Sequence, residues 1–138
     1  MRSTLVADTG VVYAALDRDD AAHDACAQLL ASGVTVAMPA SVAVELDWLA
    51  RTRGARGASA LLLRSILDGS VLVVNLDRED YERALYLMIQ YSELPLDLVD
   101  ASVIAIAERL EQDTIATLDR RHFSVVRPIH IDSFALVP

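Results

Sequence analysis

The sequence predicts an α/β fold, with a mainly parallel central sheet of four to five strands and helices on both faces. Short apolar runs alternate with longer segments of helical periodicity, which is the pattern of successive strand–helix–strand units. Apolar residues make up 54% of the 138 positions, enough for an ordinary globular core. The length suits one domain that spans residues 1–138.

The chain begins with a short strand and two helices. Residues 5–7 are apolar and end at Asp8, which predicts a strand. Residues 9–16 follow as a short helix. Residues 20–32 predict a second helix, because Gly33 after them is typical of a helix end.

The middle of the chain continues the alternation. Residues 34–38 are rich in β-branched side chains and predict a second strand. Residues 39–53 begin with proline, which suits the start of a helix, and residues 55–68 predict another helix that Gly69 ends. Residues 71–74 form a continuous apolar run, which predicts a third strand buried on both faces.

The last part of the chain holds two helices and two strands. Asp77 is placed to cap a helix over residues 78–91, in which Glu79 and Arg83 are spaced as an ion pair one turn apart. Residues 98–111 are apolar on nearly all sides, which is typical of a buried helix. Strands are predicted at residues 114–118 and, at an edge of the sheet, at 134–137.

Composition excludes several classes of protein. The net charge of −8 argues against broad, unassisted binding to nucleic acid, which needs a basic surface. Cys26 is the one cysteine, so no intramolecular disulfide forms, and we interpret it as a small core or surface residue. No leader and no membrane-spanning run is evident, so we expect a soluble, cytoplasmic protein.

Four carboxylates occupy positions that should converge. Asp8 and Asp119 follow the predicted first and fourth strands, at the sheet edge where ligands of α/β proteins bind. Glu45 lies among apolar neighbours in one helix, and Asp100 lies near the start of the most apolar helix. Each alone has an ordinary explanation as a helix cap, a helix-dipole partner, a turn residue or a solvated residue.

A divalent cation would reconcile these acids with one another. Carboxylates packed together repel, and burial raises the cost of their charges. Mg²⁺ and Mn²⁺ prefer hard oxygen ligands and keep positions open for water and a phosphate oxygen. Such a site activates the attacking water and polarises the phosphoryl group, so an acidic chain remains compatible with cleavage of RNA.

Four segments carry a resemblance to a known family: VADTGVVYAAL at 6–16, MPASVAVELDWL at 38–49, LPLDLVDASVIAIAERL at 94–110 and TIATLDRRHFSVVRP at 114–128. In this order they resemble the motifs of PIN-domain ribonucleases, most closely the VapC toxins of type II toxin–antitoxin systems. The resemblance implies a PIN-like three-layer α/β fold. It also implies a Mg²⁺- or Mn²⁺-dependent endoribonuclease, a cognate antitoxin that occupies the active-site groove, and a homodimer or a toxin–antitoxin hetero-oligomer.

The resemblance also assigns roles to the acidic residues. It implies a catalytic quartet of Asp8, Glu45, Asp100 and Asp119. Asp8 and Asp100 would be the principal metal ligands, and Asp119 would complete the metal shell directly or through water. Glu45 would orient the metal-bound nucleophilic water or take its proton.

Several neighbours of the quartet are candidates for supporting roles. Thr117 shares the strand face of Asp119, two residues away, and would support the ligands. Asp97 lies three residues before Asp100, where the family accepts several residue types, so it is an optional support. Arg120 and Arg121 are candidate phosphate contacts, with pairing to nearby acids as the alternative. For His122, a structural or solvated role is favoured over that of a general base.

Other readings account for fewer residues. Receiver domains and dehalogenase-type phosphatases rely on a lysine, and all twelve basic residues here are arginines. The three histidines are too scattered for a zinc site. DNA flap nucleases share the fold but are larger. The alternative that stays open is a catalytically inactive PIN-like module that binds RNA or protein.

The helices at 40–53 and 55–68 offer mild support for a homodimer. Four of their apolar residues exceed what one small core requires: Trp48, Leu49, Leu61 and Leu62. The alternative is that all four belong to the core.

Overall fold

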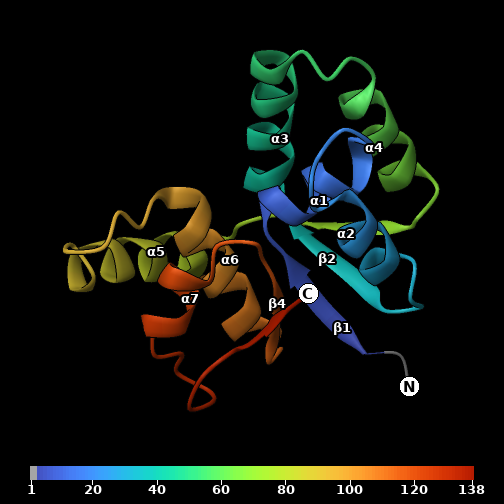
Figure 1. Cartoon of the computed structure of the whole chain (residues 1–138). Coiled ribbons are helices and arrows are strands. Elements are labelled where there is room, and N and C mark those ends of the chain that lie inside the picture. The colour runs from blue at the N-terminus through green and yellow to red at the C-terminus, as the bar shows by residue number, and fades with distance from the viewer. Residues whose placement is uncertain (1–2) are drawn as a thin grey trace.

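One parallel sheet organises the chain in the computed structural model, which describes residues 3–138 (Figure 1). Its strand order is β3-β2-β1-β4-β5, and every neighbouring pair is parallel. The strands are β1 (Thr4–Ala7), β2 (Thr35–Pro39), β3 (Val71–Val74), β4 (Thr114–Ala116) and β5 (Ala135–Val137). The predicted parallel sheet is therefore confirmed, with the last strand at an edge.

Helices cover both faces of the sheet, as the α/β prediction requires (Figure 1). The seven helices among the described residues are α1 (Thr9–Leu16), α2 (His23–Leu30), α3 (Ala40–Arg53), α4 (Ala58–Leu67), α5 (Arg78–Gln90), α6 (Leu98–Arg109) and α7 (Arg120–Val125). The helices α1, α2 and α4 lie on one face, and α5 and α6 lie on the other. The helix α3 extends from the carboxyl end of β2 beside α4.

The core is built around β1 and α6. Both faces of β1 are covered, so Val6 and Ala7 are both buried although they point in opposite directions. The helix α6 is buried from Ala101 to Glu108, as its apolar sequence predicts. Cys26 is also fully buried, so of the two alternatives of a small core or surface residue the structure selects the core.

The prediction that residues 71–74 are buried on both faces is wrong. Leu72 is 49% exposed and Val73 is 37% exposed, whereas Val71 is buried. The strand β3 is at the edge of the sheet, so one of its sides has no neighbouring strand. An apolar run alone does not distinguish such a strand from a central one.

The predicted ion pair between Glu79 and Arg83 is also wrong. Arg83 instead donates two hydrogen bonds to Glu108, from Nε to Oε1 at 2.7 Å and from a terminal nitrogen to Oε2 at 3.0 Å. Glu108 is buried on α6, where an unpaired carboxylate would be costly. The arginine therefore pairs across the α5–α6 contact rather than along its own helix.

Several predicted boundaries shift by a few residues. The second helix begins at His23 rather than at residue 20, and α4 begins at Ala58 rather than at residue 55. Pro39 ends β2 instead of opening the next helix. The fourth strand ends at Ala116, and the chain then turns into α7, which the sequence analysis does not predict.

The four residues offered in support of a homodimer divide into two pairs. Trp48 and Leu61 are exposed, whereas Leu62 is buried and Leu49 packs partly against the core. Two of the four therefore remain available as surface. No helix within residues 3–138 has the length and apolar character needed to cross a membrane.

Candidate active site

The predicted acids gather where the order of the strands reverses. The chain proceeds from β1 to β2 and β3 on one side of the sheet, and later to β4 and β5 on the other. The backbone N–H of Asp8 donates to the carbonyl of Ala116 at 2.9 Å, which joins the ends of β1 and β4. Asp119 follows β4 after a two-residue turn. A crevice at such a reversal is where open α/β sheets bind ligands.

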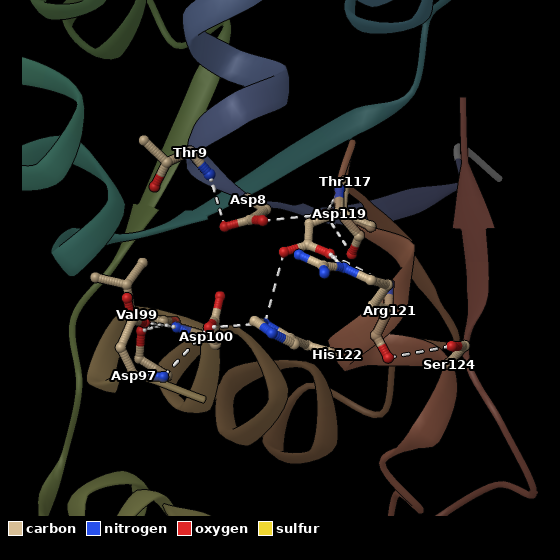
Figure 2. Close-up of polar contacts among 11 residues, drawn as sticks. Asp8, Thr9, Asp97, Val99, Asp100, Thr117, Asp119, Arg121, His122 and Ser124 are labelled. Carbon is tan, nitrogen blue, oxygen red and sulfur yellow. Dashed lines mark hydrogen bonds and ion pairs between the residues drawn. The ribbon is translucent and has the colours of Figure 1, made fainter. Parts of the chain in front are cut away.

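An open pocket of about 430 Å³ lies at this point. Its lining residues are Asp8, Thr9, Gly10, Glu45, Pro95, Asp97, Asp100, Leu118, Asp119 and His122. All four acids of the predicted quartet are among them, and they come from four different segments of the chain. Figure 2 shows Asp8, Asp100 and Asp119 around a common opening, with His122 beside it.

Thr117 links two of the acids. Asp8 Oδ1 accepts from the N–H of Thr9 at 2.8 Å, and Asp8 Oδ2 accepts from the hydroxyl of Thr117 at 3.0 Å. The same hydroxyl oxygen accepts from the backbone N–H of Asp119 at 3.0 Å (Figure 2). This buried side chain therefore orients Asp8 and holds the turn that carries Asp119.

Asp97 and Asp100 form a capping box at the start of α6. Asp97 Oδ1 accepts from the N–H of Asp100 at 2.9 Å, and Asp100 Oδ2 accepts from the N–H of Asp97 at 3.2 Å. The side chain of Asp100 lies deeper in the pocket, while Asp97 is exposed. Asp97 thus acts as the N-cap of α6, and this role accounts for its position.

Burial, with the charges of neighbouring acids, raises the pKa values of two of the acids. Burial raises the pKa of Asp8 above its usual range, hydrogen bonds from Thr9 and Thr117 oppose the rise, and the charges of Glu45 and Asp97 add to it. Burial, followed by the charge of Asp97, raises the pKa of Asp100 from 3.8 to about 7. Both shifts have the same physical origin, which is negative charge held in partly desolvated surroundings.

The two arginines after Asp119 point in different directions. Arg121 is exposed beside the pocket, where its N–H donates to Asp119 Oδ1 at 3.2 Å and its Nε lies 3.7 Å from the same oxygen. Arg120 donates instead to the carbonyl of Pro138. Contact of either arginine with phosphate stays a prediction.

His122 is the pocket residue whose environment the sequence analysis misses. It is buried, which excludes the solvated role, and its ring lies between Asp100 and Asp119. The environment was missed because the sequence analysis does not predict the helix α7, which carries His122. Asp119 is a good N-cap, and the cap places His122 three residues later on the same side of the helix as Asp119.

The chemistry of the pocket fits a hard divalent cation. Its acidic side chains supply oxygen donors only, and their mutual repulsion is relieved by positive charge. Within residues 3–138, no three carboxylate, imidazole or thiol groups already surround one point closely enough to hold an ion. Binding would therefore require the carboxylates to rotate further into the opening.

Comparison with known proteins defines the class. Residues 5–127 match the family model described as the PIN domain. This chain therefore belongs to the PIN domain family. Its relatives include Ribonuclease VapC26 of Mycobacterium tuberculosis, which is 30% identical over 135 residues, covering 97% of this chain and 100% of that protein.

Solved structures agree with this assignment at the level of the fold. VapC20 of Mycobacterium tuberculosis, described as a toxin that cleaves the sarcin–ricin loop, matches with a TM-score of 0.81 and 22% identity, covering 93% of this chain and 98% of that one. VapBC2 of Rickettsia felis, bound to a DNA fragment from its promoter, matches with a TM-score of 0.67 and 16% identity, covering 96% of each chain. A toxin–antitoxin complex from Klebsiella pneumoniae matches with a TM-score of 0.66 and 18% identity, covering 88% of this chain and 92% of that one.

Proposed function

We propose that this PIN domain is a Mg²⁺- or Mn²⁺-dependent endoribonuclease that acts as the toxin of a toxin–antitoxin pair. The observation that carries the proposal is the convergence of Asp8, Glu45, Asp100 and Asp119 on one pocket. The relationship to Ribonuclease VapC26 supports RNA as the substrate class. The reaction would be hydrolysis of a phosphodiester bond.

Each acid has a role that its position suits. Asp8, Asp100 and Asp119 would hold the cation, which when bound would polarise the phosphoryl group and make a water molecule more acidic. Glu45 faces them from α3 and would take the proton of the attacking water on its carboxylate. Thr117 keeps Asp8 turned toward the pocket through its hydroxyl.

Binding of the polyanionic substrate also needs cationic groups near the pocket. Arg121 is the better placed of the two candidate arginines, because its side chain is exposed next to Asp119 and would leave only a 3.7 Å contact with Oδ1 of that residue to reach a phosphate. Arg120 would have to leave the carbonyl of Pro138 to do the same.

The proposed partners follow from the family. Solved structures with this fold include toxin–antitoxin complexes, which supports a cognate antitoxin that covers the pocket. A homodimer, alone or within a toxin–antitoxin hetero-oligomer, is proposed with Trp48 and Leu61 as exposed apolar contacts on α3 and α4.

The test is cleavage of a mixed cellular RNA pool by the purified protein with Mg²⁺, with Mn²⁺ and with a chelator. Wild type is compared with Asp8→Asn, and with Asp132→Asn as a control that removes an exposed carboxylate outside the pocket. Discrete cuts that require both the metal and Asp8, and that persist in the control, support the proposal. No cleavage under any of the metal conditions would favour an inactive module that binds RNA or protein.

A further inference from the structure

His122 presents a buried polar atom with no hydrogen bond among the described residues. The side chain is only 9% exposed, and its Nδ1 is fully covered. The nearest acceptors are Asp100 Oδ2 at 3.3 Å and Asp119 Oδ2 at 3.6 Å (Figure 2). Buried ring nitrogens without a partner are rare because they are costly, so this placement requires an explanation.

The core determines where this ring lies. The next residue, Phe123, is fully buried and anchors α7 to the body of the protein. At the start of the same helix, Asp119 accepts from the N–H of Arg121, and at its end the N–H of Val126 bonds back to the carbonyl of His122. With α7 anchored and the ring itself buried, the imidazole has little freedom to leave the two carboxylates.

Apart from His122, none of the contacts described here links Asp100 to Asp119. Asp100 is tied to the start of α6 through the N–H of Asp97, and Asp119 is tied to α7 through the N–H of Arg121. These bonds join each acid to its own helix. Among the described residues lining the pocket, His122 supplies the one side-chain nitrogen, and it lies between the two acids.

We propose that His122 is a positioning residue whose Nδ1–H bridges Asp100 and Asp119 and holds these carboxylates at the spacing that the cation requires. This proposal rests on the proposed metal-dependent function. It needs no charge on the ring, because a neutral imidazole protonated at Nδ1 already donates. Since Nδ1 is covered and lies beside the two acids, we expect the residue to act through the carboxylates.

The two amide isosteres of histidine separate this role from simple packing. The side-chain nitrogen of Asn can occupy the place of Nδ1, whereas that of Gln extends to the place of Nε2. We therefore expect His122→Asn to keep the Mn²⁺ affinity within about threefold of wild type. His122→Gln should weaken it about tenfold or more, which is the usual effect of losing a group that orients a metal ligand. Calorimetric titration at pH 8 measures both.

A second, half-buried histidine provides the control. His130 lies near the amino end of β4, outside the pocket, where its Nε2 is 2.8 Å from the carbonyl of Gln112. His130→Gln can keep a donor near that carbonyl, so we expect unchanged Mn²⁺ affinity. Loss of affinity in this control as well as in His122→Gln would show a general effect on stability and overturn the proposal.

Kinetics distinguish positioning from catalysis. For His122→Gln we expect an unchanged KM for RNA, a lowered kcat at limiting Mn²⁺, and recovery of kcat when Mn²⁺ is saturating. A kcat that stays low at saturating Mn²⁺, with wild-type metal affinity, would assign His122 to the reaction itself and overturn the bridge.

A metal-free measurement tests the bridge independently of any activity. The ¹⁵N spectrum of the His122 ring should show a proton on Nδ1 in the wild-type protein without metal. A ring protonated only at Nε2 would overturn the proposal, whatever the protein does to RNA. A wild-type protein that binds no Mn²⁺ would instead overturn the proposed function, and the ring spectrum alone would then decide the bridge.

Discussion

Asp100 is a residue whose pKa is raised strongly by its surroundings. Its carboxyl has an ordinary pKa of 3.8 and a pKa of about 7 in the folded protein, so the folded state binds its proton more tightly than the unfolded state. By linkage, the stability that this proton contributes is fully present below pH 3.8 and is lost as the pH rises through about 7.

We therefore predict that Asp100→Asn removes cleavage and at the same time stabilises the metal-free protein at pH 8. Urea unfolding in a chelator, at pH 5 and at pH 8, measures the free energy of unfolding. The wild type should lose stability between the two values, and the variant should lose less. Equal losses in both proteins would show that Asp100 is not the source of this pH dependence.

Thr117 gives a second prediction at the scale of one residue. Thr117→Val keeps the shape of the side chain but removes the hydroxyl that joins Asp8 to the N–H of Asp119. Leaving buried polar groups unpaired should cost about 1–3 kcal/mol of unfolding free energy. Thr117→Ser keeps the hydroxyl and should cost less. If the Val variant were as stable as the wild type, the hydrogen bonds of the hydroxyl would contribute nothing measurable to stability.

At the scale of elements, the first turn of α6 carries two aspartates with different proposed roles, a helix cap and a metal ligand. Asp97 and Asp100 both lie there. The capping box is sufficient to explain the position of Asp97, whereas Asp100 is also a proposed metal ligand. Asp97→Asn should keep both the helix and RNA cleavage, because asparagine is also a good N-cap. Asp97→Ala should lose about 0.5–2 kcal/mol of unfolding free energy. Loss of cleavage in a stably folded Asp97→Asn protein would make Asp97 a metal ligand.

The elements also show what the sequence could predict. The strand–helix alternation predicts the parallel sheet, and the nearly all-apolar segment at 98–111 predicts the buried helix. Two kinds of feature depend on tertiary contacts and were missed. The exposure of Leu72 follows from the place of β3 at the sheet edge, and the pairing of Arg83 with Glu108 follows from the packing of α5 on α6.

The candidate site shows the same division. The four acids could be chosen from their places at strand ends and on apolar helices, together with the family resemblance. The environment of His122 could not be predicted, because α7 has only six residues and too few turns to show a periodic pattern. The sequence analysis separates Asp100, as a proposed ligand, from Asp97, as an optional support, but the capping box that joins them is seen only in the structure.

For the whole molecule, the exposed apolar residues of the surface lead to a prediction about self-association. Trp48 and Leu61 are exposed on α3 and α4, two helices that pack together. We predict that the wild type sediments as a dimer and that Trp48→Glu and Leu61→Glu shift it toward monomer. Ile129→Glu, at an exposed apolar residue outside both helices, is the control and should leave the dimer intact. A wild-type monomer at 100 µM, a concentration on the order of those used for weak complexes, would contradict the prediction.

The hydrogen bond from Thr117 to Asp8 spans 109 positions of the chain. A ribosome adds residues in order at about 5–20 per second, so the first acid is made many seconds before its partners. A nascent chain that has not yet reached Thr117 lacks the threonine that orients Asp8, the proposed ligand Asp119 and the helix that follows. The proposed nuclease would therefore lack a complete site until residues 117–125 have been made.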